Sequence, residues 1–250
     1  MSSNVRVTRD GGILTIRLDR AEKKNALTVA MYQAMADALK EADGDDGIRV
    51  VLIAAEGDTF TAGNDLGDFM SRPPTGPDSP VLQFLGALAS ASKPLVAAVD
   101  GAAVGVGLTM LLHSDLVYAS ERASFRTPFV DLGLVPEAAS SLLLPRLIGH
   151  QRAARMLLLC DPVDAAEAHA LGLVAAVVPV EDLEATARRA CERLAQKPPG
   201  AVRHTKALLR EAGHATVHER IAHEAQIFAS RLASAEVREA IMAFFAKRKA

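Results

Sequence analysis

The sequence predicts an α/β fold, because short apolar runs alternate with amphipathic helical patterns over its first half. Apolar runs at 50–55, 95–99 and 116–119 are long enough for buried strands, and helical segments lie between them. This alternation is typical of β-α-β units. Helical patterns dominate from about Pro136 onward, so we expect a mixed core followed by helices.

The chain opens with a predicted hairpin, a helix and a buried strand. Residues 5–8 and 13–18 are its strands, and Gly11 and Gly12 supply positive φ in the turn between them. Thr28 is expected to cap a helix that runs to about residue 42, with apolar residues at helical spacing at Met31, Met35 and Leu39. A buried strand over 50–55 follows.

Four prolines between residues 67 and 80 predict an irregular, mobile loop. We then expect helices at 81–90 and 106–112 and strands at 95–99 and 116–119. Later helices are expected at 138–148, 151–159, 165–171, 181–196, 201–210 and 217–247, with a strand at 174–178. The chain is thus expected to form a core over 1–197 and a C-terminal helical subdomain over 198–250.

Composition excludes several classes of function. A net charge of -2 and only 4% aromatic residues argue against nucleic-acid binding. Cys160 and Cys191 form no CxxC pair, so they are interpreted as reduced structural thiols. The start of the chain lacks a signal-peptide pattern, and the apolar run 101–112 is too short to span a bilayer. We therefore expect a cytoplasmic protein without membrane association.

The histidines do not predict a metal site, because no H-E-x-x-H pattern is present and the i, i+4 spacing of His214 and His218 is common on surface helices. No G-x-S-x-G nucleophile motif surrounds any serine either. We expect neither a metal nor a redox cofactor.

Two glycine-containing segments are the main candidates for a functional site. Residues 59–66 (TFTAGNDL) and 100–107 (DGAAVGVG) each follow a predicted strand. Small residues allow two backbone segments to approach one ligand atom, and a helix starting near Val106 would direct free N–H groups at it. Either segment alone could be a plain tight turn. Together they are compatible with a two-donor oxyanion hole.

These segments, with residues 119–129 and the later motif 170–174 (ALGLV), resemble the crotonase (enoyl-CoA hydratase/isomerase) superfamily. The resemblance covers nearly the whole chain. It implies a spiral of β-β-α turns, a helical C-terminal trimerisation region, an acyl-CoA thioester substrate, and a homotrimer or dimer of trimers.

The resemblance also implies binding residues. The oxyanion hole would use the backbone N–H groups of Asn64 and Val106. Coenzyme A, as part of the substrate, would lie along Ala62, Gly63, Asn64, Asp65 and Leu66 and near Gly105, and its phosphates would meet Lys247, Arg248 and Lys249. For Asp65, an equally weighted alternative is that its side chain orders its own loop through bonds to the backbone.

The chain departs from the hydratases of this family at their two catalytic glutamates, which align with Thr109 and Phe129. Neither side chain can activate water, so hydration is disfavoured and both residues are assigned to the acyl pocket. A carboxylate stands instead at Glu137, where several branches without hydratase activity carry their catalytic acid. The pattern is closest to peroxisomal-type Δ3,Δ2-enoyl-CoA isomerases and their bacterial relatives.

Glu137 has a structural alternative, because Pro136 and Glu137 open a predicted helix and acids are favoured in a first helical turn. As a catalytic base it would benefit from a raised pKa, which we attribute to apolar neighbours at Phe129, Leu134 and Val135. Asp131, the nearest rival carboxylate, is expected to have a surface role or to form a salt bridge. Ser140 and Ser141 are expected to pack beneath Glu137.

The sequence therefore predicts an isomerase that moves a 3-enoyl-CoA double bond to C2, a step in fatty acid metabolism, with Glu137 transferring the proton. A second hypothesis keeps the fold but assigns another acyl-CoA reaction, such as that of a hydratase, a dienoyl isomerase or a dehalogenase. A third, of a different class, is an acyl-CoA-binding protein without turnover.

Overall fold

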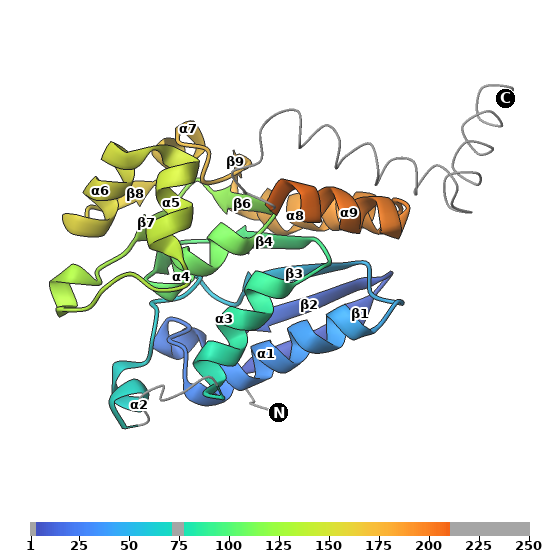
Figure 1. Cartoon of the computed structure of the whole chain (residues 1–250), viewed down its shortest axis with the longest axis horizontal. Coiled ribbons are helices and arrows are strands. Elements are labelled where there is room, and N and C mark those ends of the chain that lie inside the picture. Colours follow the sequence, from blue (N-terminus) through green and yellow to red (C-terminus); the bar gives the residue numbers. More distant parts are fainter. Residues whose placement is uncertain (1–3, 72–77, 211–250) are drawn as a thin grey trace, which may run out of the picture.

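The computed structural model describes residues 4–71 and 78–210, and its centre is a six-stranded sheet (Figure 1). Only β1 and β2 are antiparallel, and the other neighbouring strands are parallel. The strands in spatial order are β1 (Val5–Asp10), β2 (Ile13–Leu18), β3 (Val50–Ala55), β4 (Leu95–Val99), β6 (Leu116–Ser120) and β9 (Ala176–Val178).

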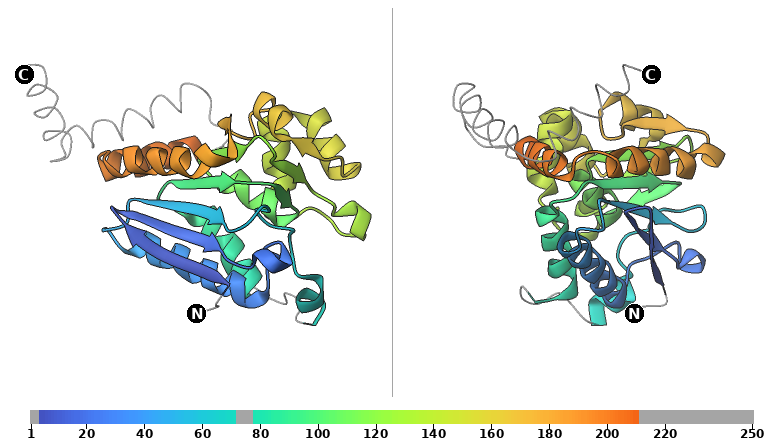
Figure 2. Two further views of the ribbon diagram at one scale, coloured as in Figure 1. Left: turned by 180° about the vertical axis from the view of Figure 1, so that it is seen from behind. Right: turned by 90° about the vertical axis from the view of Figure 1, so that its right-hand side faces the viewer.

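Helices cover both faces of this sheet, as the two further views show (Figure 2). Helices α1 (Val29–Gly44) and α3 (Pro80–Ser90) pack on one face, and α8 (Val180–Ala195) packs on the other. Residues of β3 alternate between them: Val51 and Ile53 join the α1 side, whereas Leu52 joins the α8 side. Burial on both faces explains why the strand is continuously apolar.

Helix α1 begins where the sequence predicts. The Thr28 hydroxyl accepts a hydrogen bond from the Met31 N–H at 3.3 Å and caps α1. Ser79 caps α3 in the same way through the Leu82 N–H at 3.4 Å. The predicted hairpin is also confirmed, with Gly11 and Gly12 at φ values of 57° and 79°.

The loop prediction for 67–80 is wrong at both ends. Helix α2 (Leu66–Ser71) occupies the start of this stretch, because the Asp65 side chain accepts a hydrogen bond from the Asp68 N–H at 3.1 Å. A carboxylate in that position caps a helix. Helix α3 already includes Pro80, and residues 72–77 lie outside the described part of the chain.

A small second sheet was not predicted. It comprises β5 (Ala102–Val104), β7 (Ser124–Arg126) and β8 (Val163–Asp164), so the second glycine segment is itself partly a strand. Strands of two or three residues are too short for a period-two pattern, and pairing with distant segments defines them.

The second half of the described chain is mainly helical. The predicted helix 106–112 divides into α4 (Val106–Thr109) and the 3-10 turn η2 (Met110–His113). Shorter 3-10 turns are η1 (Ala21–Lys23) and η3 (Val130–Leu132). The remaining helices are α5 (Ser140–Ile148), α6 (His150–Leu158), α7 (Ala165–Ala170) and α9 (Pro199–Arg210). The predicted helix 217–247, Lys247, Arg248, Lys249, His214 and His218 lie outside the described residues.

The predictions about the cysteines, a membrane span and a metal site can be compared with the structure only for residues 4–71 and 78–210. Cys160 and Cys191 are both free and buried, as expected. No helix in this part is long and apolar enough to cross a membrane, and no cluster of three His, Cys, Asp or Glu is arranged to hold a metal ion. The boundary at residue 198 stays a prediction, as does the cytoplasmic location.

Candidate functional site

The two glycine segments lie side by side at the carboxyl ends of β3 and β4. The Thr61 N–H donates to the Ala102 carbonyl at 3.0 Å, and the Val104 N–H donates to the Thr61 carbonyl at 3.0 Å. In open parallel sheets, ligands bind at this end of the strands. The pairing of the segments expected from the sequence is thus confirmed.

Two glycines permit this close approach. Gly63 has a φ of 92°, and a Cβ there would lie 3.0 Å from the Val104 carbonyl oxygen. A Cβ at Gly107 would lie 2.6 Å from the Thr61 Cγ2 atom, closer than side chains pack. Both positions therefore require glycine for steric reasons.

The backbone N–H groups of Asn64 and Val106 differ from those of their neighbours in their hydrogen bonding. Their neighbours are engaged: the Asp65 N–H donates to the Leu27 carbonyl at 2.9 Å, and the Gly105 N–H donates to the Arg126 carbonyl at 2.8 Å. Within the described residues, the N–H groups of Asn64 and Val106 have no acceptor. Val106 is the first residue of α4, where N–H groups lack partners within the helix.

The Glu137 carboxylate lies beside α4. Its Oε1 atom accepts a hydrogen bond from the Thr109 hydroxyl at 3.4 Å, and Thr109 is in the same helix as Val106. Burial raises the pKa of Glu137, and the Thr109 hydrogen bond opposes this by lowering it. The carboxylate therefore has a higher affinity for protons than an exposed glutamate has.

The backbone around Glu137 differs from the sequence prediction. Helix α5 begins at Ser140, so Glu137 precedes the helix and the alternative of a first-turn acid is wrong. Ala138 and Ala139 have positive φ values of 52° and 56°, which cannot continue a right-handed helix. The Ser140 N–H and hydroxyl both donate to the Glu137 carbonyl, at 2.9 and 2.7 Å. Ser140 is thus buried and holds Glu137 by hydrogen bonds, whereas Ser141 is exposed, so the predicted packing beneath Glu137 is wrong for Ser141.

The apolar neighbours predicted for Glu137 are only partly correct. Phe129 is buried, and its ring lies 4.0 Å from the position of a Cβ at Gly105. Leu134 and Val135, however, are 49% and 79% exposed, so they leave solvent access on their side. The rise in the pKa of Glu137 therefore comes from its own burial, not from these two side chains.

The other predicted binding residues surround the same region. Gly105 and Thr109 are buried, whereas Ala62 and Leu66 are exposed at the surface. Asp65 was predicted either to contact coenzyme A or to order its own loop, and the second prediction is confirmed. Its side chain caps α2 and forms an ion pair with Arg20 at 2.8 Å. These bonds lower the pKa of Asp65. Asp131 pairs with Arg126 at 2.9 Å on the surface, which confirms its predicted role.

Sequence reasoning missed Tyr32, which lies on α1 and is fully buried. Its hydroxyl donates a hydrogen bond to the Asn64 side-chain oxygen, and its ring meets Phe84 edge-on at a centroid distance of 5.5 Å. Burial raises the pKa of Tyr32, and the charge of Glu137 raises it further. The sequence does contain a hint of this role, because Tyr32 places a polar hydroxyl among the apolar residues of α1.

Comparisons with known proteins agree with this geometry. The enoyl-CoA hydratase/isomerase family profile matches residues 8–250. Rat enoyl-CoA delta isomerase 2 is 39% identical over 99% of this chain, which spans 64% of the rat protein's length. Escherichia coli 1,2-epoxyphenylacetyl-CoA isomerase is 36% identical over 95% of this chain and 93% of its own.

A solved structure gives the same result for the fold. The enoyl-CoA hydratase/isomerase of Pseudoalteromonas atlantica T6c has a TM-score of 0.81 and 45% identity, with 98% of each chain covered. The architecture of the present chain is accordingly the crotonase fold. From the family match and the relatives together, this chain belongs to the enoyl-CoA hydratase/isomerase family.

Proposed function

We propose that this protein is an enoyl-CoA isomerase that moves the double bond of a 3-enoyl-CoA to C2. One observation carries the proposal: the Glu137 carboxylate is bonded to Thr109, on the helix whose first N–H group is free to bind a carbonyl oxygen. In this proposal the base therefore lies beside the helix that supplies one of the two oxyanion-hole N–H groups. The name of the rat relative, enoyl-CoA delta isomerase 2, supports the same assignment.

In the proposed reaction, the thioester carbonyl oxygen binds the N–H groups of Asn64 and Val106. Glu137 removes a proton from C2, and the electron pair moves into the carbonyl to form a dienolate. The two N–H groups stabilise the negative charge as it develops on oxygen. Glu137 then returns the proton to C4, which leaves the double bond between C2 and C3. One carboxylate accomplishes both transfers.

The surrounding residues complete the proposal. Ala62, Gly63, Asn64, Asp65 and Leu66, with Gly105, would contact coenzyme A, which is part of the substrate and not a separate cofactor. Thr109 and Phe129 would line the acyl pocket. Hydration is disfavoured because Thr109 and Phe129 replace the two glutamates of the hydratases, so neither position supplies an acid in addition to Glu137. The active assembly is proposed to be a homotrimer or a dimer of trimers.

The test compares two reactions in the purified protein. Incubation with a 3-enoyl-CoA is expected to give the 2-enoyl product, whereas a 2-enoyl-CoA is expected to give little hydration. Glu137→Gln should reduce isomerisation by roughly 100- to 10,000-fold, the range for loss of a general acid-base group. Asp131→Asn is the matched control, because it removes a neighbouring surface carboxylate.

The outcomes separate the hypotheses. Robust hydration of the 2-enoyl-CoA, or isomerisation unaffected by Glu137→Gln, would contradict the proposed function. Saturable binding of acyl-CoA esters without any turnover would instead favour the binding protein.

A further inference from the structure

The backbone that follows Glu137 is held in an unusual conformation. Ala138 and Ala139 are consecutive residues with φ values of 52° and 56°. Residues with a Cβ rarely adopt this region, because it is strained for them and persists only where the surroundings hold it. Contacts from outside the segment must therefore stabilise it.

His113 provides such a contact. Its Nε2 atom lies 2.9 Å from the Ala138 carbonyl oxygen. The pKa of His113 is lowered, chiefly by burial; the hydrogen bond to Ala138 opposes this, and the charges of Arg210 and Lys206 add to the lowering. The neutral ring can bond a carbonyl only with the proton on Nε2. This hydrogen bond thus fixes both the tautomer of His113 and the orientation of the Ala138 peptide group.

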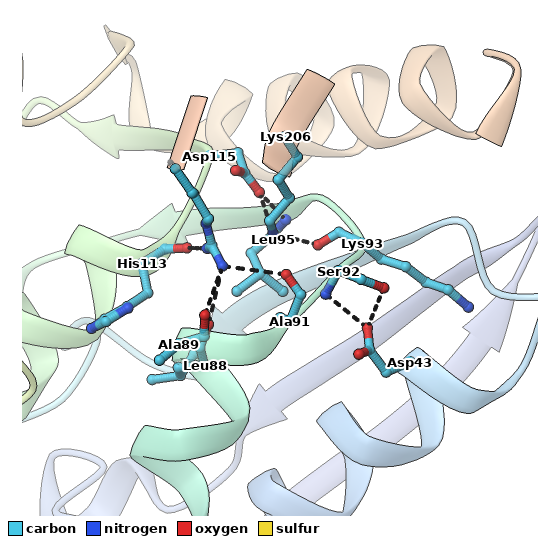
Figure 3. A network of polar contacts seen from close by, with 11 residues as sticks. Asp43, Leu88, Ala89, Ala91, Ser92, Lys93, Leu95, His113, Asp115 and Lys206 are labelled. Atoms are coloured by element: carbon cyan, nitrogen blue, oxygen red, sulfur yellow. Dashed lines mark hydrogen bonds and ion pairs between the residues drawn. The ribbon is translucent and has the colours of Figure 1, made fainter. Parts of the chain in front are cut away.

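The other end of His113 is anchored to α9. Its carbonyl oxygen accepts a hydrogen bond from the Arg210 guanidinium, which also bonds the carbonyls of Leu88, Ala89 and Ala91 at 3.4, 3.3 and 3.2 Å. In Figure 3 the His113 carbonyl faces this network, and its imidazole points away from it. His113 is therefore hydrogen-bonded to α9 and to the Glu137 segment, and Arg210 in turn joins α9 to the end of α3.

We propose that His113 is a positioning residue that holds the Glu137 carboxylate against Thr109 through its hydrogen bond to the Ala138 carbonyl. The inference rests on the proposed function, in which Glu137 transfers the proton. His113 does not touch the substrate in this role. It sets the peptide group between Ala138 and Ala139, one residue beyond Glu137. A misplacement of about 1 Å can lower a rate 100-fold.

Two substitutions at this position distinguish the hydrogen bond from simple packing. His113→Leu keeps bulk but removes the donor. In His113→Gln the amide nitrogen lies as many bonds from Cβ as Nε2 does, so it can donate to the same carbonyl. Both side chains have room, because His113, Ala139 and Arg210 line a groove of about 450 Å³.

His169→Leu is the matched control. The His169 ring also bonds a backbone carbonyl, that of Val174, at 3.2 Å. Its removal should lower stability to a similar extent without affecting Glu137.

The experiment follows the titration of the Glu137 carboxyl by ¹³C NMR; its resonance is assigned as the one that is missing in Glu137→Gln. The same proteins are then assayed for kcat and KM with a 3-enoyl-CoA. His113→Leu should lower the pKa of Glu137 as the carboxylate gains solvent. It should also reduce kcat roughly 10- to 100-fold with KM within about 2-fold. His113→Gln should restore most of both properties, and His169→Leu should change neither.

The proposal would be overturned if Glu137 had the same pKa in His113→Leu as in the wild type. It would also be overturned if the wild type is active and His113→Leu has the same kcat. If the wild-type protein isomerises no 3-enoyl-CoA, the proposed function fails separately. The NMR titration then decides the role of His113 by itself.

Discussion

The hydroxyl of Tyr32 donates a hydrogen bond to the side-chain oxygen of Asn64, so a helix early in the chain fixes one of the two proposed oxyanion-hole residues. Asn64 is further held by a bridge to Leu27, just before α1. Its backbone N–H therefore has a fixed direction before any substrate binds, which is the requirement for electrostatic preorganisation.

Tyr32→Phe should weaken this arrangement. The Asn64 side-chain oxygen loses its donor, which costs about 1–3 kcal/mol for a buried acceptor. We expect kcat to fall roughly 10-fold with little change in KM, because the loss affects charge that develops in the transition state. A chromophoric acyl-CoA should also show a smaller red shift on binding to the variant. An unchanged red shift would mean that Tyr32 does not orient the donor.

Gly63→Ala should impair both folding and activity. The residue has a φ of 92°, and the added Cβ would lie 3.0 Å from the Val104 carbonyl oxygen. We expect a loss of about 1–3 kcal/mol in the free energy of unfolding and of acyl-CoA binding. Chemical denaturation and ligand titration measure the two effects.

Gly86→Ala is the control for that substitution. Gly86 lies in α3, and a Cβ there would meet no atom within 4 Å. It should stabilise the protein by about 0.5–1 kcal/mol, because alanine favours a helix. Equal effects at Gly63 and Gly86 would show that the close approach of the two segments is unimportant.

The pH dependence of isomerisation should report Glu137. A base must be ionised, and burial raises the pKa of Glu137, so activity should be lost as the pH falls through a value above that of an ordinary glutamate. Thr109→Val removes the hydrogen bond that lowers this pKa, so the acid limb of kcat/KM should move to higher pH.

Thr109→Ser retains the hydroxyl, so its acid limb should stay near the wild-type position. An acid limb in Thr109→Val that does not move, or that moves to lower pH, would contradict the assignment of Glu137 as the base.

Lys206 should make stability depend on pH. It is buried on α9, pairs with Asp115 at 2.7 Å, and burial lowers its pKa to about 8. Above that pH the unfolded state binds more protons at this lysine than the folded state does, so folding stability rises with pH. Relative to Lys206→Met, the wild type should gain about 1–2 kcal/mol between pH 7 and 9.5.

Denaturant unfolding of both proteins at the two pH values measures this difference. Lys206→Met should also be less stable at pH 7, since it leaves the Asp115 carboxylate without its cation. If the difference in free energy of unfolding between the two proteins is the same at both pH values, the pKa of Lys206 does not change on folding.

Elements that bury a continuous apolar surface could be predicted from the sequence. Strands 50–55 and 95–99 occur as predicted, because both faces of each strand are buried and the pattern depends only on the strand itself. The Thr28 cap of α1 is equally local, since donor and acceptor lie within one turn. The paired glycine segments were also evident from sequence order and spacing, whereas the candidate carboxylate Glu137 was identified through the family resemblance.

The sequence by itself determined the fold class, because alternating strand and helix patterns are local, and its motifs gave the family resemblance from which the residues expected to react were taken. Only the tertiary structure decided how the residues meet. It placed Tyr32 on Asn64, His113 on Ala138 and Thr109 on Glu137, and it separated Glu137 from the helix that follows. These contacts join residues that are far apart in the chain, and their geometry depends on packing between elements, which no local pattern records.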